Sequence, residues 1–164
     1  MRSKSTKPPV ATALSRTLRS LMIASAFGMA GAAMAAPVKV GLALDISGPF
    51  AALGAEARDG FALGIKQLGG KLGGQPVEFV QADMAGSPDQ AKQLVDRMIQ
   101  RDKIDLFSGP IGSNIAIAVG PTLFAAKVPY LSSNAGPSQF AGAQCNAYFF
   151  GTAYQNDQCH EAAG

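Results

Sequence analysis

Hydrophobic and polar positions after residue 37 follow two alternating patterns. Residues 38–44 form a short, nearly continuous aliphatic run, which is typical of a strand buried on both faces. Residues 76–83 instead alternate, with Val77 and Phe79 on one side, and this predicts a strand nearer the edge of a sheet. Three further short apolar runs complete five predicted strands, at residues 104–108, 128–132 and 147–151.

Segments with helical spacing lie between these strands. After a loop at residues 45–54, residues 55–68 carry apolar side chains at helical intervals and end at Gly69-Gly70. Ser87-Pro88-Asp89-Gln90 has the pattern of a capping box, and it precedes a helix with a regular apolar stripe. That stripe consists of Ala91, Leu94, Val95, Met98 and Ile99.

Two more helices are predicted downstream. Ser113 or Asn114 is expected to cap a helix over residues 115–127, interrupted at Gly120-Pro121, and Asn156 or Asp157 to cap a last helix. Strands and helices that alternate at this spacing form βαβ units. The sequence therefore predicts an α/β fold, a doubly wound parallel sheet with helices on both faces.

The composition excludes a disordered chain, because 48% of the residues are hydrophobic and only 15% are charged. The formal net charge of +3 arises near the N-terminus, where there is no acidic residue. Without these N-terminal bases, nine basic residues face eleven acidic ones, which argues against a nucleic-acid-binding surface or an anionic-membrane partner. The N-terminal bases are Arg2, Lys4, Lys7, Arg16 and Arg19.

The N-terminal segment has the pattern of a secretory signal peptide. A basic region precedes a largely apolar stretch at residues 21–35, which ends in Ala33-Met34-Ala35, an A-x-A cleavage site. We expect a signal at residues 1–35, cleavage before Ala36, and a mature exported chain at 36–164 in the periplasm. An uncleaved anchor is the alternative, but a spanning helix needs about 20 apolar residues, so no membrane anchor is expected.

Polar residues gather where the predicted strands end, and in an open parallel sheet ligands bind at that edge. Most are small, neutral hydrogen-bonding residues and glycines, which suit a carboxylate or another small anion. The alternative is that they only cap helices and fill turns. The segments are residues 45–48, Asp83, 108–114, 132–136 and Thr152.

The sequence lacks the patterns of common catalytic, cofactor and metal sites. It contains no G-x-S-x-G elbow and no G-x-G-x-x-G after the first strand. Its His, Cys and carboxylate residues are nowhere spaced as in a metal site. Residues 64–72 differ from a P-loop in register and in Leu72, which replaces the required Ser or Thr. We expect a non-enzymatic protein without a cofactor; a hydrolytic enzyme on the same architecture is the alternative.

Cys145 and Cys159 are the two cysteines of the chain. An exported protein is expected to form disulfides. The predicted strand between these two cysteines, however, holds their Cα atoms farther apart than the roughly 5.5 Å between the Cα atoms of a bridged pair. Each is expected to pair elsewhere or to stay free.

Five motifs in order resemble one family. They are residues 45–54 after the first strand, Ala55-Glu56 with Asp59-Gly60, Asp83, residues 109–114 and residues 128–135. Together they resemble the type I periplasmic solute-binding proteins of ABC importers, in the class that binds branched-chain amino acids. Residues 133–138, 144–146 and 148–150 look most like members that carry aromatic acids.

The resemblance implies two lobes that close on a ligand for an ABC permease, with this chain as the first lobe. Because members are much longer, we expect an N-terminal fragment whose second lobe is missing. A ligand-sensing receptor domain of the same fold is an alternative. Gly136 lacks the hydroxyl that amino-acid binders carry, which favours a plain carboxylate. The ligand-binding residues implied are Gly112, Ser113, Asn134, Ala135, Gly136, Leu53 and Tyr154.

Overall fold

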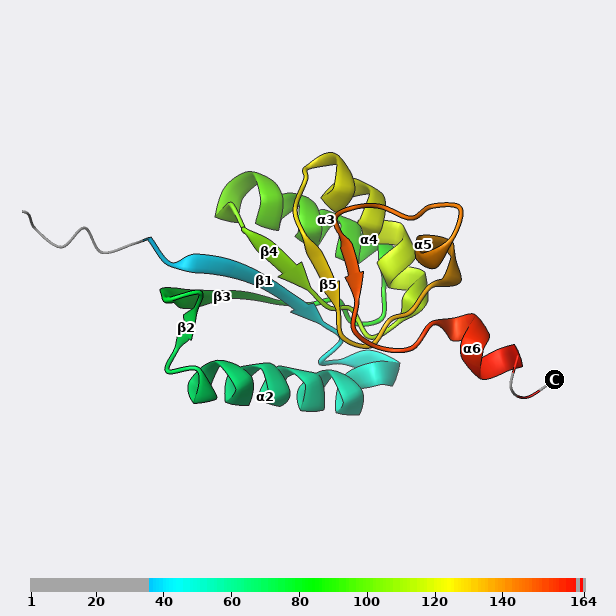
Figure 1. Ribbon diagram of the computed structural model, residues 1–164, viewed down its shortest axis with the longest axis horizontal. Helices are drawn as coiled ribbons and strands as arrows, with labels where there is room; N and C mark the ends of the chain where they lie inside the picture. The colour runs from blue at the N-terminus through cyan, green and yellow to red at the C-terminus, as the bar shows by residue number, and fades with distance from the viewer. Residues whose placement is uncertain (1–35, 162, 164) are drawn as a thin grey trace, which may run out of the picture. The chain divides into compact units, whose positions relative to one another are not determined.

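The computed structural model describes residues 36–161 and 163, so the predicted leader at residues 1–35 lies outside the described residues. Six strands form one sheet in the order β2-β3-β1-β4-β5-β6 (Figure 1). All neighbouring strands are parallel except β2 and β3. The strands are β1 (Val38–Leu44), β2 (Lys71–Leu72), β3 (Gln75–Asp83), β4 (Leu106–Ser108), β5 (Tyr130–Ser132) and β6 (Phe149–Gly151). The predicted α/β fold with a parallel sheet is confirmed.

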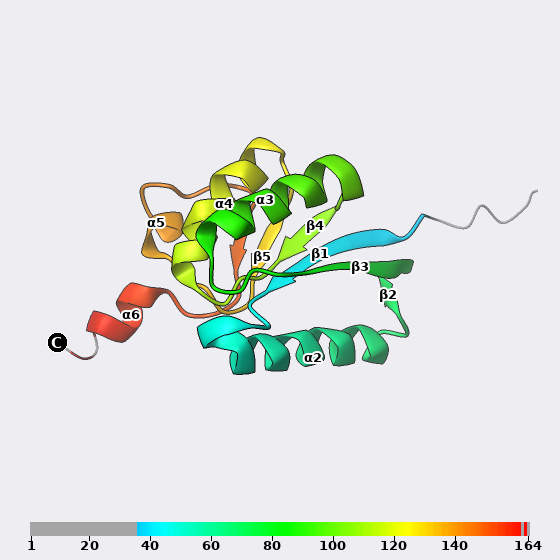
Figure 2. The same ribbon diagram turned by 180° about the vertical axis from the view of Figure 1, so that it is seen from behind.

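Helices cover both faces of the sheet. Helix α2 (Ala51–Gln67) lies against one face, whereas α3 (Pro88–Arg97) and α4 (Ser113–Ala125) lie on the other (Figures 1 and 2). A 3-10 turn, η1 (Gly48–Phe50), leads into α2, and a π turn, η2 (Met98–Asp102), extends α3. The short helices α5 (Ser138–Ala141) and α6 (Asn156–Glu161) flank β6 in the chain.

The central strand β1 is buried on both sides, as its continuous aliphatic run predicts. Ala43 belongs to a large core cluster between the sheet and α3 and α4. Leu42 and Leu44 belong to a smaller cluster with Phe61 of α2. Burial of alternate side chains in two separate cores explains why no polar position interrupts this strand after Lys39, at its less buried beginning.

Helix α3 begins as its capping motif predicts. The Ser87 hydroxyl accepts a hydrogen bond from the Gln90 backbone N–H at 3.4 Å. The Gln90 side chain, however, donates to the Asp83 carbonyl at 3.1 Å, so it holds α3 to the end of β3. Ala91, Val95 and Met98 of the predicted stripe are fully buried.

Three local predictions were wrong. Helix α2 begins at Ala51, inside the predicted loop, because Pro49 in η1 is compatible with the turn that leads into a helix. Helix α4 begins at Ser113, with Gly112 as its N-cap and no side-chain cap from Ser113 or Asn114. It also continues through Pro121, because buried side chains on both sides of the proline, Val119 and Leu123 among them, hold the helix against the core.

The sheet also contains a hairpin that the sequence analysis did not predict. Lys71 and Leu72 pair antiparallel with Pro76 and Gln75 around the Gly73-Gly74 turn. Two strand residues are too few to show alternation. The hairpin places β2 at the edge of the sheet and β3 next to it, near the edge as the sequence predicts.

A row of edge-on aromatic contacts joins β4, β5 and β6 to α4 and α5. Ring centroids lie 5.2 Å apart for Phe107–Tyr130 and Tyr130–Phe149, 5.0 Å for Phe140–Phe149 and 5.3 Å for Phe124–Phe140. Burial raises the pKa of the Tyr130 phenol well above its ordinary value, so this side chain stays neutral. The contacts fix the outer strands to the core in a geometry that aromatic pairs favour.

Within residues 36–161, no helix is both long and apolar enough to cross a membrane. Cys145 and Cys159 are exposed and are not bonded to each other.

Candidate functional site

A buried carboxylate organises the loops at the carboxyl edge of the sheet. Asp45, directly after β1, is completely buried. It accepts hydrogen bonds from the backbone N–H groups of Gly86 at 2.8 Å and Ile111 at 3.0 Å. The loop before α3 and the loop before α4 are therefore both attached to the end of the central strand.

Asp83, at the end of β3, holds the loop after β1. Its Oδ1 accepts hydrogen bonds from the N–H groups of Ala85 at 2.9 Å, Ile46 at 3.0 Å and Ser47 at 3.3 Å. Burial acts to raise the pKa of Asp83, but the Ser47 hydroxyl and these three N–H groups together outweigh it, and the pKa is lowered. The ionised form of Asp83 is therefore the one that stabilises these loops.

The lowered pKa of Asp83 predicts a contribution to stability that acid removes. Because the folded-state pKa lies below the unfolded value of about 3.9, the contribution is present above that value and is lost as the pH falls through the folded-state pKa. Asp83→Asn keeps an acceptor oxygen but cannot ionise. Urea unfolding at about pH 6 and about pH 3 should show a smaller acid destabilisation in Asp83→Asn than in wild type. Equal losses in both would contradict this role.

The start of α4 presents unpartnered backbone donors. Among the described residues, the N–H groups of Ser113 and Asn114 donate to no protein acceptor, as is usual in the first turn of a helix. The loop before them is held by Asn134, whose Nδ2 donates to the Ile111 carbonyl at 2.9 Å. An ideal Cβ at Gly112 would lie 3.2 Å from Cε2 of Phe50, so this aromatic ring borders the same turn. The turn thus combines anion-binding donors with an apolar wall.

The Ser113 side chain is joined to a residue far away in sequence. Asn156, the first residue of α6, donates from Nδ2 to Ser113 Oγ at 3.1 Å. The reverse contact, from Ser113 Oγ to Asn156 Oδ1, measures 3.5 Å. Asn156 was predicted only as a possible helix cap, and no local pattern in the sequence indicates this contact.

Ala135 and Gly136 are placed by packing within the chain. Ala135 is buried with 2% of its surface exposed, and its carbonyl accepts from the Ser132 hydroxyl. A Cβ at Gly136 would lie 1.9 Å from the Tyr154 carbonyl oxygen, so only glycine allows the two segments to pass this closely. The Gly136 carbonyl accepts from the Asn156 backbone N–H at 2.8 Å. The absence of a hydroxyl at Gly136 thus has a structural cause in this chain.

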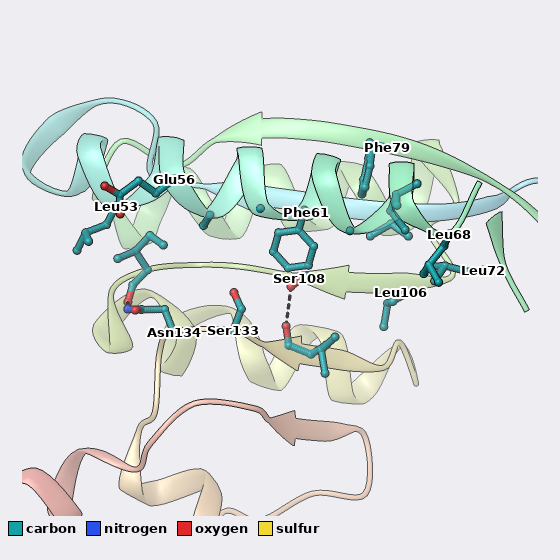
Figure 3. Close-up of a pocket in the computed structure, with 17 residues that line it drawn as sticks. Leu53, Glu56, Phe61, Leu68, Leu72, Phe79, Leu106, Ser108, Ser133 and Asn134 are labelled. Atoms are coloured by element: carbon teal, nitrogen blue, oxygen red, sulfur yellow. Dashed lines mark hydrogen bonds between the residues drawn. The ribbon is translucent and has the colours of Figure 1, made fainter. Parts of the chain in front are cut away.

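A cleft of about 600 Å³ runs between α2 and strands β4 and β5 (Figure 3). Its walls are largely apolar, with Phe61 pointing from α2 toward the strands. Leu53 and Asn134 lie at one end, near Ser133, whose Oγ is buried without a hydrogen-bond partner. The cleft therefore has a polar end next to the loops after β4 and β5.

The seven predicted binding residues do not all line one cavity. Gly112, Ser113, Asn134, Ala135 and Gly136 lie in the loops that follow β4 and β5, and Leu53 borders the cleft with half of its surface exposed. Tyr154, also half-exposed, lines a separate hollow of about 290 Å³ together with Gly136. Two neighbouring residues went unpredicted as site residues. They are Phe50 and Asn156.

The polar groups described at the start of α4 are neutral hydrogen-bond donors. The only histidine of the sequence, His160, is exposed in α6. Within the part of the chain that the structure describes, no group of three His, Cys, Asp or Glu residues could hold a metal ion. The arrangement can bind and orient a small anion through hydrogen bonds.

Known proteins are similar to this chain in sequence and fold. The "Leu/Ile/Val-binding protein homolog 6" of Brucella abortus (strain 2308) is 34% identical over 110 residues, which are 66% of this chain and 28% of the relative. A solute-binding protein of an ABC transporter from R. palustris, solved with benzoate, is 34% identical with a TM-score of 0.73. The match covers 75% of this chain and 34% of that one. A second R. palustris solute-binding protein, solved with 4-hydroxybenzoate, is 32% identical with a TM-score of 0.67, over 73% and 32% of the two chains.

This chain spans about a third of the length of these solved relatives, and its sheet matches one lobe of their fold. A family model described as "Periplasmic binding protein" matches residues 37–164, nearly all of the sequence after the predicted leader. By this match, together with the relatives and the shared fold, the chain belongs to the periplasmic binding protein family.

Proposed function

We propose that this chain forms the first lobe of an exported solute-binding protein that captures a small carboxylate and delivers it to an ABC permease. The observation that carries the proposal is the start of α4, where free N–H groups and the Ser113 hydroxyl directly follow Gly112, the residue that the Phe50 ring borders. Neutral donors at a helix N-terminus stabilise a carboxylate, and the aromatic ring suits an apolar body attached to it. Removal of residues 1–35 would place the protein in the periplasm.

The ligand proposed is an aromatic carboxylate, with a branched-chain amino acid as the alternative. Two relatives of known structure were solved with benzoate and 4-hydroxybenzoate, whereas the curated relatives are named for leucine, isoleucine and valine. Gly136 offers no hydroxyl for an α-ammonium group, and no acidic side chain in the described part of the chain is hydrogen-bonded to Ser113, Asn134 or Gly136. Both observations favour a ligand without a positive charge.

The direct test is an NMR titration of the ¹⁵N-labelled chain with benzoate, 4-hydroxybenzoate, leucine and isoleucine. Concentrations should reach tens of millimolar, because one lobe encloses only part of a ligand and each hydrogen bond then competes with water. The aromatic acids should shift the amide signals of Ser113, Asn114 and Asn134 more than the amino acids do. A larger response to leucine or isoleucine would select the alternative ligand, and no response at these residues would refute the proposed site.

In a two-lobed protein that encloses the ligand, Ser113→Ala is expected to weaken carboxylate binding by roughly 10- to 150-fold, because a hydrogen bond to a charged group is worth about 1.5–3 kcal/mol. In the single lobe, where binding is already weak, the benzoate-induced shifts of Asn114 and Asn134 should shrink or disappear from the accessible concentration range. Thr122→Ala is the matched control, since it removes a half-buried hydroxyl from the same helix, about two and a half turns away. Unchanged affinity in Ser113→Ala would place the carboxylate elsewhere.

A further inference from the structure

Asn156 connects both loops that form the candidate site. Its backbone N–H donates to the Gly136 carbonyl at 2.8 Å, and its side chain donates to Ser113 Oγ at 3.1 Å. Ser113 follows β4, Gly136 follows β5, and Asn156 follows β6. One residue of α6 therefore fixes the spacing between two neighbouring loops at the carboxyl edge of the sheet.

The direction of the Asn156–Ser113 contact determines what the serine can offer a ligand. A hydroxyl has one hydrogen to donate and two lone pairs that accept. When Asn156 Nδ2 donates to Ser113 Oγ, the contact occupies a lone pair and leaves the serine hydrogen free. The opposite contact would use that hydrogen, but its distance of 3.5 Å is longer than the 3.1 Å of the donation from Nδ2.

We propose that Asn156 is a positioning residue that makes Ser113 a hydrogen-bond donor toward an anionic ligand, and so sets the preference of the site for a carboxylate over a neutral amide. The inference rests on the proposed function, because it takes Ser113 as a ligand contact. The amide of Asn156 is itself neutral, so the group that is hydrogen-bonded to Ser113 adds no negative charge beside a carboxylate ligand. Recognition by polarity in this way rejects the wrong ligand by leaving two donors, two acceptors or two like charges face to face.

Asn156→Asp tests this polarity with almost no change in shape. An aspartate at this position can only accept, so it takes the Ser113 hydrogen and leaves a lone pair of Oγ toward the ligand. It also adds a negative charge beside the ligand carboxylate. Benzoate binding should weaken by at least about tenfold. Benzamide has the same ring with an amide group, whose N–H groups can donate, in place of the carboxylate. It should bind Asn156→Asp at least as well as it binds the wild-type chain.

The experiment compares benzoate and benzamide in NMR titrations of wild type, Asn156→Asp, Asn156→Ala and Gln158→Glu. Gln158→Glu is the matched control, because it adds the same charge within α6 and keeps an oxygen that accepts from the Gln155 N–H. It should leave the preference for benzoate unchanged. Asn156→Ala should reduce benzoate affinity without reversing the preference, since the serine hydroxyl becomes free to rotate. Thermal unfolding of each variant identifies any loss of folding. If Asn156→Asp does not fold, the loss of benzoate affinity in Asn156→Ala still tests whether Asn156 positions Ser113.

The possible outcomes distinguish a failure of this inference from a failure of the proposed function. A preference that reverses to benzamide only in Asn156→Asp supports the positioning role, which a purely structural contact would not produce. Equal weakening of both compounds in Asn156→Asp, or an unchanged preference for benzoate, overturns the inference and leaves the carboxylate site in place. If the Ser113 and Asn134 signals of the wild-type chain respond to neither compound, the proposed site is overturned, and the inference with it.

Discussion

Gly109→Ala is expected to destabilise the fold severely. Gly109 follows β4 with a φ of 112°, a conformation that residues with a side chain rarely adopt. A Cβ at this position would lie 1.9 Å from the Ala43 carbonyl oxygen, which belongs to the backbone of the central strand and cannot move without disturbing the sheet. Backbone strain and overpacking together should cost about 2–6 kcal/mol, a large share of the roughly 5–15 kcal/mol that stabilises an ordinary domain.

Circular dichroism with urea unfolding measures the effect of Gly109→Ala. The control is Gly60→Ala in the middle of α2, where an added Cβ meets no atom within 4 Å. Because alanine is the better helix former, Gly60→Ala should be neutral or stabilise the chain by up to about 1 kcal/mol. A Gly109→Ala protein with a wild-type urea midpoint would show that the loop after β4 does not pass this close to β1.

Asp45→Ala should destabilise the chain by about 3–6 kcal/mol. The substitution removes a fully buried carboxylate that accepts from Gly86 and Ile111, and a hydrogen bond to a charged group contributes about 1.5–3 kcal/mol. Both N–H groups would lose their protein acceptor, and the loops that they anchor would separate from β1. The same substitution should also abolish ligand-induced shifts at Ser113, because Ile111 lies two residues before it.

Urea unfolding again provides the measurement, with Asp96→Ala as the control. Asp96 is an exposed carboxylate on α3 without a hydrogen bond or salt bridge among the described residues. Its replacement should change the free energy of unfolding by no more than about 0.5 kcal/mol. If Asp45→Ala were as mild as this control, the buried carboxylate would not be what holds the loops together.

The fold could be predicted from the sequence because burial sets the pattern of its elements. The aliphatic run of β1 reflects two cores, and the stripe of α3 reflects its packing against α4. The path of α4 through Pro121 could not be predicted, since tertiary burial there overrides a strong local signal. The two-residue strand β2 was too short to have a pattern.

The candidate site could be predicted only as far as the topology of a parallel sheet allows. Strands that end at one edge bring Ser113 and Asn134 into neighbouring loops, which is why these residues could be grouped without a structure. The close approach of Gly136 to Tyr154 and the bond from Asn156 to Ser113 depend on how distant segments pack. No spacing along the chain encodes such contacts.

The order of strands in the sheet has a consequence for how the chain acquires its structure. The strand that comes first in the described sequence, β1, lies in the interior of the sheet, between β3 and β4. Val38 pairs with Val77, and Val40 pairs with Leu106, so both neighbours of β1 are distant in sequence. Large loops must close before either pairing forms, which raises the contact order and slows folding. The most apolar strand thus stays unpaired until β3 has formed, and it is paired on both sides only when β4 joins the sheet.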